Sequence, residues 1–133
     1  YSREYIQFVR NTVPISLVVS AFKRTQEGAW HPARKSYREV CNLQPYGGSA
    51  KHKRYRCLCP FHIEKTPSFF VMDTKGSFTC LGCGERGDAF GFVMKMRDVS
   101  FPQAVRFVAL LGGIHPEHLH VKRRKKQRKR GSS

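Results

Sequence analysis

Acidic residues are scarce in this chain, and it has no long apolar stretch. Asp and Glu account for 9 of the 133 residues, against 25 Lys and Arg, which gives a formal net charge of +16. The few carboxylates are scattered, so we expect no acidic cluster that could hold catalytic metal ions. The longest apolar-rich run, Ile15 to Phe22, is too short for a bilayer span of about 20 residues. The charge excess predicts a polyanionic partner.

The cysteines are odd in number, which argues against a disulfide framework without removing it as an alternative. There are five, and no secretory signal segment accompanies them. Four candidate ligands instead form two short pairs, Cys59-Pro-Phe-His62 and Cys80-Leu-Gly-Cys83, and the residues between the pairs are enough for a hairpin. Three thiolates and one imidazole suit a tetrahedral Zn²⁺ with no open position. We therefore predict one structural zinc ion.

Other interpretations of the cysteines stay open at this point. Cys80 and Cys83 could form a redox pair, although this leaves Cys59 and His62 without a role. Cys57 lies two residues before Cys59 and could replace it, although Cys59 makes the tighter turn with His62. Cys41 has no partner at ligand spacing.

Strand patterns surround the ligand pairs, and helix patterns stand on either side of them. We expect strands over 53–58, 68–73 and 77–80, with Gly76 closing a hairpin. We expect two short helices within 3–22, with Ser2 as a cap and Pro14 in the first turn of the second. Asp88 caps a helix to about residue 98, and Ser100 with Gln103 makes a capping box for the next, which Gly112 ends. The expected fold is α+β, a zinc ribbon with a small antiparallel sheet.

The chain divides into four segments. They are N-terminal helices at 1–22, an insertion or irregular segment at 23–50, a zinc-binding domain at 51–112, and a basic tail or linker at 113–133. The run from Lys122 to Arg130 is almost wholly basic and is expected to stay disordered unless neutralised. A solvated linker, a phosphate-binding arm and a nuclear import signal all remain open for it. Because the chain begins with Tyr1, we expect it to be a fragment of a longer protein.

Several motifs resemble one family in order and spacing. The chain reads Cys-Pro-Phe-His-Ile-Glu-Lys-Thr-Pro-Ser-Phe from Cys59, Cys-Leu-Gly-Cys-Gly from Cys80, Gly87-Asp88, and Ser-Phe-Pro-Gln-Ala-Val from Ser100. This closely resembles the N-terminal zinc-binding domain of bacterial-type (DnaG) DNA primases over residues 55–112, and weakly over 3–22. The resemblance implies a zinc ribbon that helps a primase engage single-stranded template DNA during primer synthesis.

The resemblance also implies partners and a setting. Nucleotidyl transfer in that family belongs to a separate catalytic domain, so this chain is expected to be non-catalytic alone and to act with that domain in cis or in trans. It implies that the full-length protein binds a replicative helicase. It implies no association with a membrane. The implied location is the bacterial cytoplasm or nucleoid, and the basic tail leaves an organelle or nucleus open. A zinc-ribbon RNA-binding or transcription module and a thiol redox enzyme are the rival functions.

Candidate nucleic-acid contacts surround the ligand pairs. If Phe69 and Val71 face the helices, Phe70 and Met72 are left outward on a basic sheet, where Phe70 could stack on bases. The alternative is that Phe70 packs under residues 1–50. The full set of candidates, with Tyr55 as a weaker one, is Lys53, Arg54, Tyr55, Arg56, Lys65, Phe70, Met72, Lys75 and Arg86. Phe78 is a further weak candidate.

Overall fold

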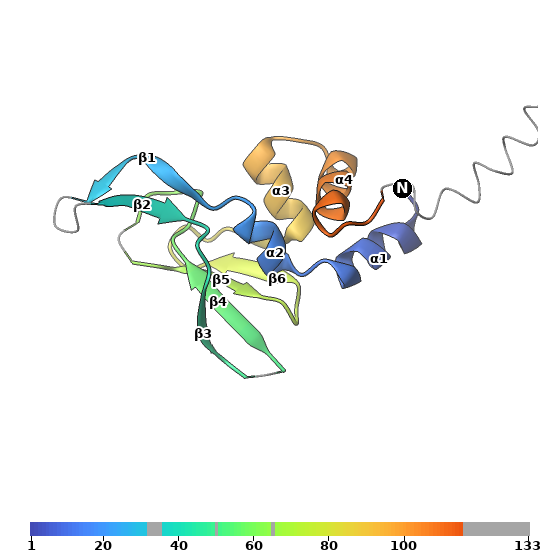
Figure 1. Cartoon of the computed structure of the whole chain (residues 1–133), viewed down its shortest axis with the longest axis horizontal. Helices are drawn as coiled ribbons and strands as arrows, with labels where there is room; N and C mark the ends of the chain where they lie inside the picture. The colour runs from blue at the N-terminus through green and yellow to red at the C-terminus, as the bar shows by residue number, and fades with distance from the viewer. Residues whose placement is uncertain (32–35, 50, 65, 116–133) are drawn as a thin grey trace, which may run out of the picture.

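An antiparallel sheet of five strands forms the centre of the fold (Figure 1). The structure is a computed structural model that describes residues 1–31, 36–49, 51–64 and 66–115. The strands pair in chain order, so each connects to the next by a turn or loop. They are β3 (Gln44–Gly48), β4 (Lys53–Cys57), β5 (Phe69–Met72), β6 (Ser77–Cys80) and β7 (Arg86–Asp88). The predicted α+β class and the three predicted strands are confirmed.

The β5–β6 hairpin turns as the sequence predicts. Gly76 adopts a positive φ of 62°, a conformation that costs glycine little, and its N–H donates to the Asp73 carbonyl oxygen over 3.1 Å. The hairpin returns the chain from His62 to Cys80 and so brings the two ligand pairs to one end of the sheet.

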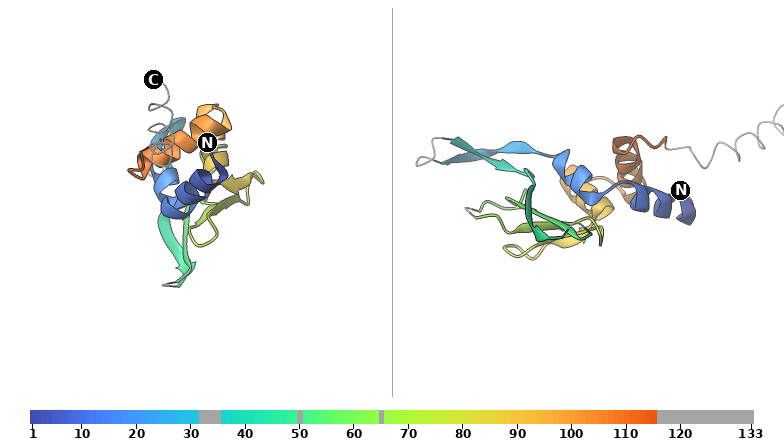
Figure 2. Two further views of the ribbon diagram at one scale, coloured as in Figure 1. Left: turned by 90° about the vertical axis from the view of Figure 1, so that its right-hand side faces the viewer. Right: turned by 60° about the horizontal axis from the view of Figure 1, so that its bottom comes forward.

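Three strands lie within residues 23–50. For this segment the sequence suggested an insertion or irregular structure. β1 (Arg24–His31) and β2 (Ser36–Val40) form a separate antiparallel hairpin. Figures 1 and 2 show this hairpin extending from the body of the molecule at the end opposite α1. The third strand, β3, pairs with β4, so the main sheet begins at Gln44, upstream of residue 51.

Four helices lie on one side of the sheet, as the views in Figures 1 and 2 show. They are α1 (Arg3–Thr12), α2 (Ile15–Ser20), α3 (Ala89–Arg97) and α4 (Phe101–Leu111). The predicted caps Ser2 and Asp88 and the Ser100 capping box are confirmed. Pro14 is the N-cap of α2, one residue before the first turn where the sequence placed it. Among the described helices, none combines the length and apolar character of a membrane span.

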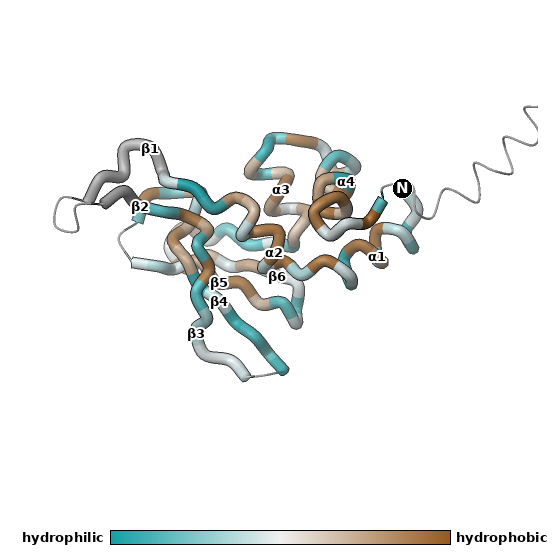
Figure 3. Tube along the Cα trace, viewed as in Figure 1, coloured by the Kyte–Doolittle hydropathy of each residue, from teal (hydrophilic) through white to brown (hydrophobic). Residues whose placement is uncertain are grey.

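The core lies between the helices and the inner face of the sheet. Phe69 and Phe78 stack with ring centroids 5.1 Å apart, and Phe92 of α3 meets Phe78 edge-on at 5.5 Å. Figure 3 shows hydrophobic segments gathered where the sheet and helices face one another. Phe61, in the turn between Cys59 and His62, packs against Phe92 at 5.7 Å. The aromatic core therefore supports the first ligand pair directly.

Specific contacts hold the N-terminal helices to the ribbon. Asp73, in the β5–β6 turn, accepts hydrogen bonds from the Ser16 N–H at 2.8 Å and the Ser16 hydroxyl at 2.6 Å. Arg10 forms an ion pair with Asp88 at 3.2 Å. The Tyr5 hydroxyl donates to the His115 carbonyl oxygen at 3.1 Å, just beyond α4. The expectation that both helices pack on the ribbon is confirmed.

Candidate metal centre and outer sheet face

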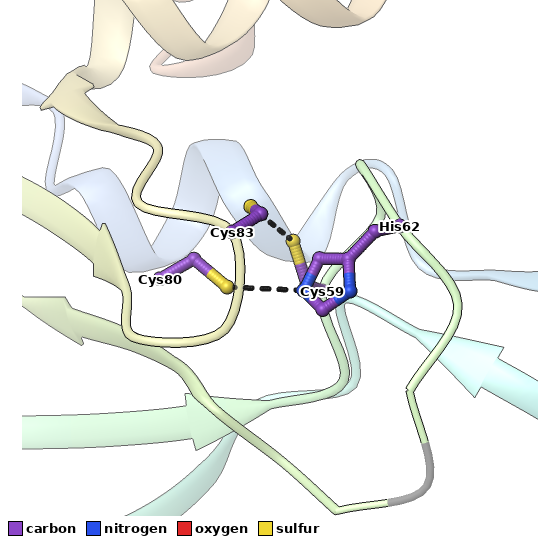
Figure 4. Close-up of side chains that lie close together, drawn as sticks. All are labelled: Cys59, His62, Cys80 and Cys83. Carbon is purple, nitrogen blue, oxygen red and sulfur yellow. Dashed lines mark hydrogen bonds between the residues drawn. The ribbon is translucent and has the colours of Figure 1, made fainter.

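Two turns at the same end of the sheet bring four ligand side chains together (Figure 4). Cys59 and His62 follow β4, Cys80 is the last residue of β6, and Cys83 lies in the turn toward β7. One ligand atom from each of these residues lies within 4.8 Å of all the others. The structure thus brings together the four residues that the spacing selected.

The donor set and its dimensions fit a tetrahedral zinc ion. Bonds of about 2.3 Å to sulfur and about 2.0 Å to nitrogen imply S···S edges of about 3.8 Å and S···N edges of about 3.5 Å. The Sγ atoms of Cys59 and Cys83 lie 3.9 Å apart, and His62 Nε2 lies 3.3 Å from Cys80 Sγ. The side chains therefore lie close to the positions that zinc coordination requires.

The thiols differ in how readily they ionise. Burial opposes ionisation of Cys80, but the nearby Ser68 hydroxyl, two backbone N–H groups and His62 outweigh it and lower the pKa of Cys80 to about 6. Burial raises the pKa of the Cys59 thiol. Cys80 is therefore a thiolate near neutral pH, whereas Cys59 must lose its proton when a cation binds.

Backbone hydrogen bonds shape the second turn. Cys80 N–H donates to the Glu85 carbonyl oxygen at 2.7 Å, and Leu81 N–H donates to the Ser68 carbonyl oxygen at 2.9 Å. A Cβ atom on Gly82 would lie 2.8 Å from both His62 Cε1 and Ser68 Oγ. Glycine is thus required at residue 82 by close approach, a constraint that spacing alone did not reveal.

Cys57 and Cys41 lie outside the ligand cluster. Cys57 is buried at the end of β4, opposite Phe69, and burial raises the pKa of its thiol. Burial also raises the pKa of Cys41, to about 12. The cluster of donor atoms includes Cys59 and not Cys57, which favours the ligand set with the tighter turn.

Aligned strand registers place one row of residues across the opposite face of the sheet. Arg56 pairs with Phe70, Phe70 with Thr79, and Thr79 with Arg86; beside this row, Arg54 pairs with Met72. Directly opposed residues of antiparallel strands share a face. Phe69 and Val71 are buried while Phe70 and Met72 are half-buried, so the predicted alternation along β5 is confirmed. We call the outer face Tyr46, Arg54, Arg56, Phe70, Met72, Thr79 and Arg86.

Tyr46 of β3 belongs to this face, although the sequence did not single it out. Its ring centroid lies 5.6 Å from that of Phe70, and the guanidinium of Arg56 lies over the Tyr46 ring at 4.1 Å. Arg54 approaches the same ring at 5.5 Å and donates from Nε to the Tyr46 carbonyl oxygen at 3.0 Å. A shallow hollow of about 400 Å³ between Tyr46 and exposed Leu81 is lined by Phe70 and Met72.

Comparison with known proteins assigns the family. Residues 48–127 match the family model described as the CHC2 zinc finger, the DnaG zinc ribbon. The chain belongs to this family. Together with the cluster of three cysteines and one histidine, membership establishes the fold as a DnaG-type zinc ribbon and indicates that it binds zinc.

Relatives of the zinc ribbon are much longer proteins. The DNA primase of Streptomyces coelicolor is 38% identical over 111 residues, which cover 84% of this chain and 14% of that primase. The DNA primase of Chlamydia trachomatis is 56% identical over 55 residues, 41% of this chain and 9% of the relative. A crystal structure of the Aquifex aeolicus primase, comprising its zinc binding and RNA polymerase domains, matches with a TM-score of 0.58 and 31% identity, covering 82% of this chain and 21% of that one. The chain therefore spans a small part of the proteins it matches.

Some predicted nucleic-acid contacts lie elsewhere on the zinc ribbon. Tyr55 pairs with Val71 and packs against the core, so its side chain lies on the inner face, away from the outer-face candidates. Phe78 is buried and is likewise not an outer-face residue. Two basic candidates, Lys53 and Lys75, are exposed at a strand end and in a turn, while the exposed Arg86 belongs to the outer face. Lys65 and the tail at 122–130 lie outside the described residues.

Each carboxylate near the zinc ribbon's two ligand pairs has a structural partner. Asp73 binds Ser16, and Asp88 accepts from the Gly91 N–H at 2.8 Å. Glu85 pairs with Lys95. The fourth, Glu64, accepts hydrogen bonds beside the ligands. The four side chains thus meet different partners and do not converge on one site.

Proposed function

We propose that this chain is the zinc-dependent module with which a DnaG-type primase recognises single-stranded template DNA for RNA primer synthesis. The observation that supports this proposal most is the outer face. There the rings of Tyr46 and Phe70 adjoin each other between arginine side chains, in a chain that belongs to the DnaG zinc-ribbon family. Exposed aromatic rings beside basic groups are the arrangement that single-stranded nucleic acids use.

In this proposal Cys59, His62, Cys80 and Cys83 hold one Zn²⁺. The ion supplies structure by fixing the two turns, because four protein ligands leave no position for a reacting water. Three thiolates and a neutral imidazole make the centre net −1, so the metal itself does not attract phosphate. The surrounding residues must bind the template.

The outer face offers two kinds of contact. Each base that stacks on an aromatic ring contributes about 1–3 kcal/mol, with little dependence on its sequence. Arg54 and Arg56 on β4 and Arg86 on β7 would neutralise phosphates on either side of the stacked bases, which makes affinity fall as salt rises. Lys53 and Lys75 extend the basic surface at the strand ends. Phe70 and Met72 form the floor of the hollow in which a base would lie.

The carboxylates near the two ligand pairs bind structural partners and do not converge on one site. This supports a role in recognition, without catalysis by this chain alone. Phosphoryl transfer requires metal ions held at the reacting oxygens, usually by carboxylates. We propose that a primase catalytic domain, in cis or in trans, supplies them, and that a replicative helicase is reached through the full-length protein. The bacterial sources of the curated relatives support action in the bacterial cytoplasm or nucleoid.

Primer synthesis in three parallel reactions tests this function. The reactions contain this chain, a DnaG-type catalytic fragment without its zinc domain, or both, with single-stranded template, nucleotides and Mg²⁺. We expect no labelled primer from this chain alone and a higher yield from the mixture than from the fragment. Primer made by this chain alone contradicts the modular role. A tethered fusion of the two parts repeats the test at high local concentration, and no gain there contradicts the proposal.

Binding preference separates the proposal from its rivals. Fluorescence anisotropy with single-stranded DNA and with a matched RNA duplex should favour the single strand. Preference for the duplex supports the RNA-binding alternative. Reversible disulfide formation without bound metal supports the redox alternative.

A further inference from the structure

We infer that Glu64 is a positioning residue of the metal centre, whose carboxylate joins the first ligand turn to the second through Ser68. The inference rests on the proposed zinc ligands. The Glu64 side chain is 9% exposed. Its Oε2 atom accepts the N–H of Cys59 at 2.9 Å and the N–H of Ser68 at 3.1 Å. One carboxylate oxygen thus fixes the backbone of the first ligand.

The other oxygen reaches toward the remaining ligands. Oε1 lies 3.3 Å from His62 Nε2 and accepts the Ser68 hydroxyl. Ser68 Oγ is in turn 3.5 Å from Cys80 Sγ, and the Ser68 carbonyl oxygen binds the backbone of the second turn at Leu81. Glu64 and Ser68 therefore contact three of the four ligand residues, from both turns.

Charge alone does not explain a carboxylate at this position. A buried carboxylate is unfavourable unless it is hydrogen-bonded, and a zinc centre of net −1 beside Glu64 would repel it. The donors from Cys59 and Ser68 compensate for both effects, since hydrogen bonds to an ionised acceptor are strong. Glu64 therefore contributes to the site by orienting the groups that donate hydrogen bonds to it, namely the Cys59 N–H and the N–H and hydroxyl of Ser68.

Gly82 of the second turn lies close to both Ser68 and the His62 ring. A side chain at residue 82 would collide with Ser68 Oγ and with the His62 ring, since a Cβ there lies 2.8 Å from each. Outer groups that orient zinc ligands typically alter metal affinity about 10–100-fold when removed. Replacing Glu64 with alanine leaves the Cys59 and Ser68 N–H groups without this acceptor and frees the Ser68 hydroxyl to rotate.

Zinc affinity of the full chain tests the inference, measured by competition with a chromophoric chelator. Glu64→Ala should weaken zinc binding about 10–100-fold. Glu64→Gln should weaken it less than about tenfold, because the amide oxygen can accept both N–H groups and the amide nitrogen can donate to Ser68 Oγ. Glu85→Ala is the matched control, since Glu85 adjoins the second turn but pairs with Lys95, and should leave affinity unchanged.

Cobalt substitution distinguishes positioning from a general loss of stability. The visible spectrum of bound Co²⁺ reports ligand geometry, so Glu64→Ala should change its band positions and intensity. Val108→Ala, a core substitution in α4, should lower stability and leave the spectrum as in wild type. Wild-type affinity in Glu64→Ala, or a Glu64→Gln variant as weak as Glu64→Ala, overturns the inference. Failure of wild type itself to bind zinc would instead overturn the proposed ligand function.

Discussion

The two faces of the main sheet use alternate residues of the same strands for different purposes. On the inner face, Phe69, Val71 and Phe78 are buried against the helices. On the outer face, Phe70 lies one residue from Phe69 yet contacts Tyr46 and remains half-buried beside Arg56. Both faces carry aromatic rings, but the outer one also carries arginines, on β4 and on β7.

This comparison shows how a small domain combines a core with a binding surface. Successive side chains of a strand point to opposite faces, so a single residue of displacement separates a packing role from a contact role. Substitutions on the inner face should change the free energy of unfolding, and those on the outer face should change affinity for nucleic acid. Metal loss should remove the distinction, because the ligand turns connect the strands that carry both faces.

The largest expected effect comes from removing the metal. Cys83→Ser, or chelation of wild type, should lose zinc and unfold the ribbon, since structural zinc supplies on the order of 10 kcal/mol of folding free energy. Native mass spectrometry and circular dichroism measure both changes. Cys41→Ser should keep the metal, because Cys41 is not in the ligand cluster. Full metal retention in Cys83→Ser contradicts the ligand assignment.

The paired substitutions Phe69→Ala and Phe70→Ala test the two faces directly. Phe69→Ala should lower the free energy of unfolding by about 3–5 kcal/mol, because it opens a cavity among packed rings. Phe70→Ala should instead lower the free energy of binding single-stranded DNA by about 1–3 kcal/mol, with little change in salt dependence. Denaturant unfolding and fluorescence anisotropy provide the two measurements. If Phe70→Ala melts the domain and leaves affinity unchanged, the assignment of faces is wrong.

The smallest expected effect concerns a single outer-face charge. Arg56→Gln should reduce the magnitude of the slope of log affinity against log salt by about 0.7, the value for one phosphate contact on a single strand. Arg106→Gln, at an exposed position of α4, makes the same change of net charge away from the outer face and is the control. Titrations at several salt concentrations compare the variants. Equal slopes in both would indicate that net charge, rather than the outer face, attracts the template.

Local signals in the sequence predicted the cluster of Cys59, His62, Cys80 and Cys83, the helix caps and the β5–β6 hairpin. Ligand spacing, a capping box and a turn glycine each act within a few residues, so they can be recognised without knowing the rest of the fold. The inward side chain of Tyr55 could also have been predicted. Alternation along β4, like that along β5, places Tyr55 on the face opposite Arg54 and Arg56.

Features that depend on tertiary contacts were missed. β3 contains Pro45, Gly47 and Gly48, residues that normally argue against a strand, but as an edge strand it pairs only with β4 and tolerates them. Tyr46 was therefore overlooked. The links from Glu64 and Ser68 to Cys80 were also missed, because they depend on how the two turns meet in space.

The hydrogen bond from Tyr5 to His115 has a consequence for the order of folding during synthesis. Its partners are 110 residues apart in the chain. At roughly 5–20 residues per second, a ribosome delivers the second partner on the order of ten seconds after the first. The β5–β6 hairpin, whose paired residues are close in sequence, can form within that interval. We therefore expect α1 to settle last, with the finished ribbon serving as the surface on which this helix docks.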